Sequence, residues 1–165
     1  MTDYFKKLVA EYNSAKSEFL KSIIYDAMLG YVEEYHEGYV RYDMDMYVAL
    51  YKCSTTPGQR ASALKQMDEI IVDDYIYTDG LIENFKAFVS LKDFLNVDDV
   101  VEFDILCMKE LNFFKARFDA TVSGEKNYVS VGEAKEELKD VAQLIVSTGM
   151  FDMGSYQLAS RILEI

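Results

Sequence analysis

The single histidine of the sequence and the carboxylates near it are the residues that first suggest metal chemistry. Glu33 and His36 are three positions apart, so on a helix their side chains share one face. Glu-x-x-His pairs with this spacing hold di-iron centres in helical bundles, but each centre needs two such motifs and further glutamates. Because the chain has no second histidine, di-iron and zinc-protease motifs are excluded. We therefore expect no metal at His36, and an exposed or interfacial position for it.

Carboxylates alone could still hold Mg²⁺ or Ca²⁺. The acids of "VDDYIYTD", residues 72–79, are either adjacent or five positions apart. A calcium loop instead places ligands at alternate positions around a central glycine and ends in a glutamate. We predict no metal site from this segment, and a carboxylate-based, metal-dependent enzyme stays the third of three functional alternatives.

Nucleophilic catalysis has little support in the sequence. Cys53 and Cys107 have no neighbouring histidine, and the chain contains no Gly-x-Ser-x-Gly, phosphate loop or dinucleotide fingerprint. We therefore predict no catalytic residue, no cofactor and a protein that is not an enzyme. The two cysteines lie far apart without metal-ligand spacing, so we expect two small buried side chains in a reducing cytoplasm.

Charge gives the strongest indication of function. The formal net charge is −12 and the pI is near 4.5, so the chain repels nucleic acid and anionic lipid, because each phosphate contact needs a cation. We expect no direct nucleic-acid binding and no membrane binding. The excess of negative charge is concentrated in two segments, since residues 26–45 carry a net charge of −5 and residues 66–104 a net charge of −9. A basic protein surface is the partner that this pattern favours.

Tyrosines stand among the acids of both blocks. Tyrosine is enriched in interfaces because it gives contact area at low entropic cost, whereas a charge run by itself is usually a solvated helix face. The predicted partner-binding residues combine the two types: Glu33, Glu34, Tyr35, Glu37, Tyr39, Asp43, Asp45, Asp68, Glu69, Asp73, Asp74, Asp98, Asp99 and Glu102.

The elements that must position these residues are predicted to be helices. Half the residues are hydrophobic, and one proline with eight glycines is few for 165 residues. No linker appears, so we predict an all-α, single-domain bundle (residues 1–165) of about six or seven helices. No apolar run is long enough to span a bilayer, and because the N-terminal residues are charged throughout, we expect no signal peptide.

Apolar spacing and caps place the helices. One long amphipathic helix is predicted over residues 2–29, capped by Thr2 and ended by Gly30. Residues 31–53 fit helical spacing over a longer stretch than they fit strand alternation, so helix is favoured, and the choice stays open for residues 39–50.

Later helices are predicted over residues 57–75, 81–89, 96–118, 130–148 and 155–164. Capping boxes open two of them, one formed by Thr56 and Gln59 and the other by Ser130 and Glu133. The 96–118 helix is apolar on most sides and is expected at the centre of the bundle. A minor β-hairpin or a loop is expected near residues 120–131.

These observations favour a non-catalytic, cytoplasmic binding protein whose acidic face docks a basic surface of a partner. The composition of the chain is similar to that of proteins from phage and mobile elements that imitate nucleic acid. This similarity covers no aligned residues. That similarity implies an anti-defence inhibitor of a nuclease or of another nucleic-acid-handling protein. The alternative from another class is a structural or assembly homo-oligomer held by tyrosine and methionine faces.

Overall fold

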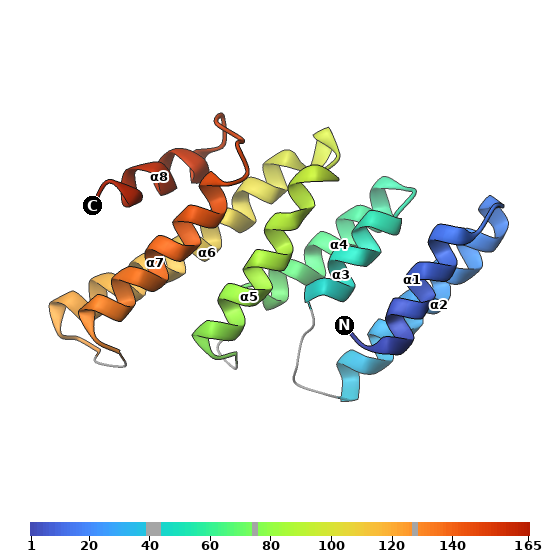
Figure 1. Ribbon diagram of the computed structural model, residues 1–165, viewed down its shortest axis with the longest axis horizontal. Coiled ribbons are helices and arrows are strands. Elements are labelled where there is room, and N and C mark those ends of the chain that lie inside the picture. The colour runs from blue at the N-terminus through green and yellow to red at the C-terminus, as the bar shows by residue number, and fades with distance from the viewer. Residues whose placement is uncertain (39–43, 74–75, 127–128) are drawn as a thin grey trace. The chain divides into compact units, whose positions relative to one another are not determined.

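The N-terminal part of the chain forms a helical hairpin in the computed structural model (Figure 1). Helix α1 (Asp3–Ser14) ends where Ala15 takes extended backbone, and α2 (Glu18–Gly38) begins shortly after it. The Ser17 hydroxyl accepts a hydrogen bond from the Leu20 N–H at 3.1 Å, as a helix N-cap does. This break lets α1 fold back and pack against α2.

The single helix predicted over residues 2–29 is therefore wrong. Its apolar stripe is interrupted by the reversal of the chain, and two residues of that stripe, Phe19 and Ile23, are exposed on α2. Gly30, which was predicted to end the helix, lies inside α2 and leaves open space where a side chain would stand.

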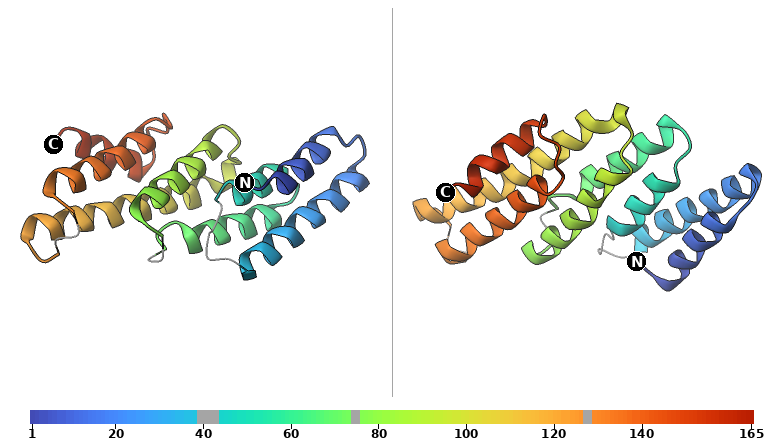
Figure 2. Two further views of the ribbon diagram at one scale, coloured as in Figure 1. Left: turned by 60° about the horizontal axis from the view of Figure 1, so that its bottom comes forward. Right: turned by 45° about the horizontal axis from the view of Figure 1, so that its top comes forward.

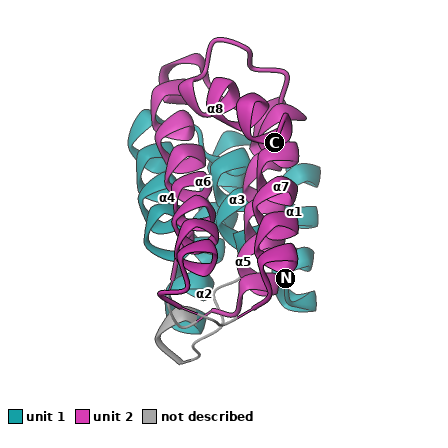
Figure 3. Cartoon of the chain, turned by 90° about the vertical axis from the view of Figure 1, so that its left-hand side faces the viewer, with its two compact units in different colours: residues 1–70 teal, residues 71–165 magenta. Residues whose placement is uncertain are grey.

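The structure describes residues 1–38, 44–73, 76–126 and 129–165, without the side chains of residues 36–38. Within these residues there are eight α-helices, two short 3₁₀-helices and no strand. The predicted all-α fold is confirmed, with eight helices where six or seven were expected. Two compact units make up the chain, residues 1–70 and residues 71–165 (Figure 3). The single-domain organisation stays a prediction.

Helices α3 (Met44–Cys53) and α4 (Pro57–Ile70) complete the first unit. From Met44 onward the ambiguous segment is helical, while residues 39–43 lie outside the described residues. The predicted capping box of α4 is confirmed, because the Gln59 N–H donates to the Thr56 hydroxyl at 3.2 Å and the Gln59 side chain accepts the Thr56 N–H at 3.3 Å. α4 ends at Ile70 rather than at the predicted residue 75.

Hydrogen bonds and apolar packing hold the first unit together. The predicted cap Thr2 is confirmed, since its hydroxyl accepts the Phe5 N–H at 3.3 Å and lies 2.9 Å from the Tyr31 hydroxyl on α2. The buried Tyr12 hydroxyl donates to the Cys53 carbonyl at 2.8 Å and so ties α1 to the end of α3. The core includes Phe5, Met28, Met44, Met46, Leu50, Leu64, Met67 and Ile70.

The second unit is built from four α-helices and two 3₁₀-helices (Figures 1 and 2). In chain order they are α5 (Thr78–Val89), η1 (Ser90–Asp93), η2 (Val97–Asp99), α6 (Val100–Ser123), α7 (Val131–Val146) and α8 (Gly154–Leu163). Three stacked phenylalanines form the centre of the core: Phe88 lies 6.0 Å from Phe85 and 4.9 Å from Phe103, between ring centroids. α7 packs against α5, α6 and α8.

Helix α6 differs from its prediction in two respects. It is not buried on most sides, because Val101 and Ile105 are exposed on one face. It also continues to Ser123, so the first half of the β-hairpin considered for residues 120–131 is helical, and residues 127–128 lie outside the described residues. Gly124, with φ +78°, ends α6 in the left-handed conformation that favours glycine.

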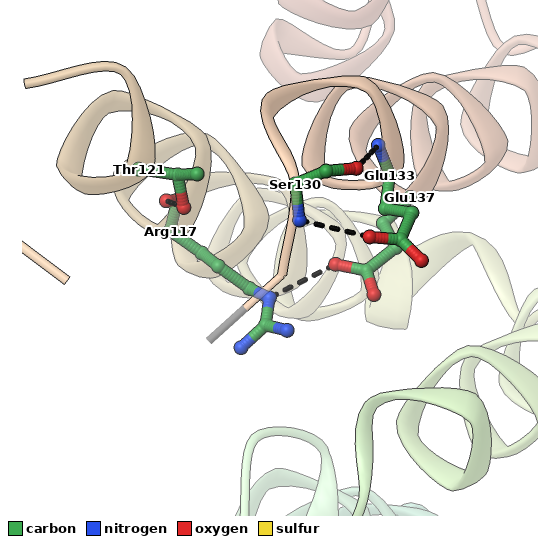
Figure 4. Close-up of polar contacts among 5 residues, drawn as sticks. All are labelled: Arg117, Thr121, Ser130, Glu133 and Glu137. Carbon is green, nitrogen blue, oxygen red and sulfur yellow. Dashed lines mark hydrogen bonds and ion pairs between the residues drawn. The ribbon is translucent and has the colours of Figure 1, made fainter. Parts of the chain in front are cut away.

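Two sets of polar contacts lie where α7 begins beside the end of α6, a cap within α7 and an ion pair between the two helices (Figure 4). Ser130 and Glu133 form the predicted capping box, in which the Ser130 N–H donates to the Glu133 carboxylate at 2.8 Å. Nearby, Arg117 Nε donates to the Glu137 carboxylate at 2.9 Å, and both side chains are largely buried. Hydrogen bonds from the Ser130 hydroxyl and N–H lower the pKa of the Glu133 carboxyl.

Candidate binding surface

The predicted partner-binding residues of the first unit lie on three helices. Glu33, Glu34, Asp45 and Glu69 are exposed, and Tyr35 and Asp68 are half-buried. The Tyr35 ring stacks on that of Tyr31, with centroids 6.0 Å apart. Glu37 belongs to α2, but its side chain is not described, and Tyr39 and Asp43 lie outside the described residues.

A second set of predicted residues gathers in the second unit, where α6 begins. Asp98 and Glu102 are exposed there, and Asp99 is half-buried. Asn96 caps the start of η2, because its side-chain oxygen accepts the Asp98 N–H at 3.0 Å, and α6 follows η2 directly. Asp73, which follows α4 in the sequence, is half-buried, and Asp74 is outside the described residues.

A surface cleft of about 420 Å³ lies beside these acids, between the first turns of α6 and the loop that joins α7 to α8. We call it the α6 cleft, and its lining residues are Val100, Val101, Asp104, Gly149, Met150, Phe151, Asp152 and Met153. Its volume falls within the usual range for ligand and peptide pockets.

The loop that forms one wall of the α6 cleft is held by α6 itself. The Asp104 carboxylate accepts the N–H of Gly154 at 3.0 Å and that of Ser155 at 2.9 Å, so it caps the start of α8 from another helix. Gly149, at φ +68°, makes the turn that follows α7. Lys92 Nζ adds a third tie to the Ser147 carbonyl at 2.8 Å. Figures 1 and 2 show the loop beside the first turns of α6.

The wall and edge of the α6 cleft expose large apolar side chains. Val97 is 81% exposed, Val101 72% and Phe151 69%, values that in a folded domain mark residues without an intramolecular cover. Phe151 is held by an edge-on contact with Tyr156, with ring centroids 5.1 Å apart, so its outward position is supported. Exposed apolar side chains in a cleft next to carboxylates are typical of a protein-binding surface.

Sequence reasoning missed the apolar half of this surface. Val101 and Ile105 were assigned to a helix buried on most sides, and only the packing of the second unit shows which side stays uncovered. Asp104 and Phe151 were not singled out, because they are 47 positions apart in the sequence. The acidic residues in "NVDDVVEF" were the available signal, and they led to Asp98, Asp99 and Glu102.

Two polar side chains are fully buried in the second unit, Glu110 on α6 and Ser155 on α8. The Glu110 carboxylate has no hydrogen-bond partner among the residues that the structure describes. Burial raises the pKa of Glu110 to about 9, so this carboxyl is protonated at neutral pH. Burial, with Asp104 and Glu110 nearby, raises the pKa of the Cys107 thiol. Both cysteines are buried and free, as predicted.

A smaller cleft of about 190 Å³ lies in the first unit, between α2, α3 and α4. Its lining includes the buried Tyr25 and Tyr47, together with Glu33 and Gln66. Glu33 is the predicted binding residue on its edge. This volume is below that of typical ligand pockets, and Val32 and Leu50 beside it are part of the core.

In the described part of the chain, no group of three or more His, Cys, Asp or Glu residues is placed to hold a metal ion. None of the helices in that part combines the length and the apolar character needed to cross a membrane. No protein-family model, curated protein or solved structure matches this chain.

Proposed function

We propose that this chain is a non-catalytic, acidic binding protein that docks a basic surface of another protein. The observation that carries the proposal is that Asp98, Asp99 and Glu102 are next in sequence to Val100 and Val101, which line the α6 cleft, so that acids and exposed apolar side chains adjoin. Charged groups at the rim of an interface steer association and select the partner, and the apolar centre supplies affinity. A cytoplasmic location is part of the proposal.

The concrete form of the proposal is an inhibitor of a nucleic-acid-handling protein, of the kind that phage and mobile elements encode. Such a partner has a basic surface evolved for phosphates, and the net charge of −12 suits it. In this form, DNA should compete with the chain for its partner. Partner binding that DNA leaves unaffected would restrict the proposal to a basic surface that does not bind nucleic acid.

An affinity experiment with matched charge variants tests the proposal. The full chain is immobilised and exposed to cell lysate, alongside the triple variant D98N/D99N/E102Q and a control variant, E125Q/E136Q/D140N. Both variants remove three exposed or half-exposed acids of the second unit. We expect the wild type and the control variant to retain basic proteins, and D98N/D99N/E102Q to lose them. The retained proteins should elute between about 0.1 M and 0.5 M salt.

Equal retention by all three proteins would contradict the proposal, and so would retention that salt does not weaken. Proteins retained by the control and lost from D98N/D99N/E102Q are then identified and tested as purified partners, which separates a specific partner from general ion exchange.

A homo-oligomer remains a second candidate because of one observation in the first unit. Phe19, Leu20 and Ile23 form an exposed apolar strip at the start of α2, with Phe19 78% exposed. Strips of this kind are covered in many oligomers. Size-exclusion chromatography with light scattering should then give a multiple of the monomer mass for the wild type and the monomer mass for F19S/I23S. A wild type that stays monomeric over a concentration series excludes this candidate.

A further inference from the structure

We propose that the α6 cleft receives a basic amphipathic helix of the partner protein. The inference rests on the function proposed above and specifies its binding mode. The apolar face of the partner helix would lie on Val101, Met150 and Phe151, and its lysines and arginines would face Asp98, Glu102 and Asp152.

The apolar half of the surface has the form of a helix-binding groove. Val101 lines the cleft from α6, and Ile105, one turn further along α6, is also exposed, while Phe151 lines the cleft from the loop between α7 and α8. Met150 and Met153 also line the cleft, and methionine adapts its shape to the side chains that it meets. Every regular element among the described residues is a helix, so they offer no sheet edge to an extended strand, and helix-in-groove recognition is the mode that fits.

Charge determines the class of helix. The residues that line the cleft include two carboxylates, Asp104 and Asp152, and no lysine or arginine. The segments that contain them, residues 93–108 and 149–160, hold six carboxylates and no lysine or arginine. Lys92 and Lys109 flank the first segment and Arg161 follows the second, and Lys92 is bonded to the Ser147 carbonyl. An acidic helix would therefore meet like charge around its apolar contact, whereas a basic helix gains opposite charge there. Charge complementarity thus selects a cationic occupant.

The loop wall is preorganised for this role. Asp104 holds it through two backbone hydrogen bonds, and Tyr156 supports the Phe151 ring. An exposed aromatic side chain fixed before binding loses little conformational entropy when a partner covers it. Phe151 is accordingly the anchor that we expect to contribute most to affinity.

Fluorescence anisotropy with a synthetic helix tests the inference on the full chain. The probe is a labelled peptide of leucine and lysine, about 14 residues or four turns long, with leucine at helical spacing. Three comparison peptides isolate its properties: serine replaces leucine in the first, glutamate replaces lysine in the second, and a central proline breaks the helix in the third. We expect only the leucine–lysine helix to bind well, with each comparison peptide about tenfold weaker or worse.

Variants locate the binding site. Val101→Ser and Phe151→Ser should each weaken the probe about fivefold to tenfold, since each removes an exposed apolar contact. The matched control is Val122→Ser, which alters another exposed valine of the same helix, 57% exposed. It should bind like the wild type. Circular dichroism of all three checks that the fold is unchanged.

The outcomes separate the inference from the function on which it rests. If D98N/D99N/E102Q weakens the probe while V101S and F151S do not, an acidic docking surface stands and the helix in the cleft is wrong. If the proline peptide binds as well as the leucine–lysine helix, the occupant need not be helical and the inference is wrong. If the glutamate peptide binds as well, the occupant need not be cationic and the inference is also wrong. If the leucine–lysine helix does not bind the wild type, the inference is overturned. The proposed function fails as well if lysate capture is equal among the charge variants or is not weakened by salt.

Discussion

The carboxylate of Asp104, on α6, accepts the backbone N–H of Ser155, at the start of α8, over 2.9 Å. The same carboxylate accepts the N–H of Gly154 at 3.0 Å. One side chain therefore satisfies two N–H groups that a helix start leaves without partners. It also holds the loop that carries Phe151, so Asp104 contributes both to the stability of the second unit and to the shape of the α6 cleft.

Replacing Asp104 with alanine should destabilise the second unit by about 1–2 kcal/mol, the usual cost of removing a helix cap. Asp104→Asn keeps one acceptor oxygen and should therefore lose less stability than the alanine variant. Urea unfolding followed by circular dichroism measures both. An alanine variant with the unfolding midpoint of the wild type would show that the cap contributes nothing to stability.

Glu110 should make the free energy of unfolding fall as the pH rises. Burial raises its folded pKa to about 9, whereas in the unfolded chain the pKa is near the usual 4.5. Below pH 4.5 the carboxyl is protonated in both states. Between pH 4.5 and 9 only the unfolded state ionises, so stability is lost through this window, on the order of 3 kcal/mol by pH 7.

The substitution Glu110→Gln should remove that pH dependence, because an amide stays neutral in both states. We expect E110Q to gain stability relative to the wild type from pH 5 to pH 8, in urea unfolding at a series of pH values. Glu136→Gln, at an exposed position of α7, is the control and should keep the slope of the wild type. A slope that E110Q leaves unchanged would mean that Glu110 is ionised in the folded protein.

The ion pair between Arg117 and Glu137 should stabilise the contact of α6 with α7. The Arg117 and Glu137 side chains are only 19% and 16% exposed, so solvent screens the pair less than at an open surface. We expect a coupling energy of about 1–2 kcal/mol, above the usual value for exposed pairs. A double-mutant cycle with R117A and E137A measures it, and additive single effects would show that the two side chains do not interact.

The parts of the fold that depend on local signals could be predicted from the sequence. Thr56 with Gln59 and Ser130 with Glu133 form the expected capping boxes, because a cap needs only residues within one turn. The reversal at Ala15 was missed, since apolar residues continue at helical spacing through it. Its local signal was Ser17, which caps α2.

Predicting the candidate surface required tertiary information that no single segment holds. The acids at positions 98, 99 and 102 could be found as a charge cluster. The exposure of Val101 depends on where α7 and α8 pack on α6, and spacing alone assigned it to the core. The cap from Asp104 to Ser155 spans 51 positions, a separation at which sequence pattern gives no indication of contact.

The most direct test of the proposed docking surface is an NMR titration of the ¹⁵N-labelled chain with the leucine–lysine peptide. Backbone amide shifts report which residues the peptide contacts. We expect the largest changes at residues 97–105 and 149–156, the two walls of the α6 cleft, and small changes along α1 and α2. Largest changes elsewhere, for example around Glu33 and Glu34 or spread evenly over both units, would contradict a docking site in the α6 cleft.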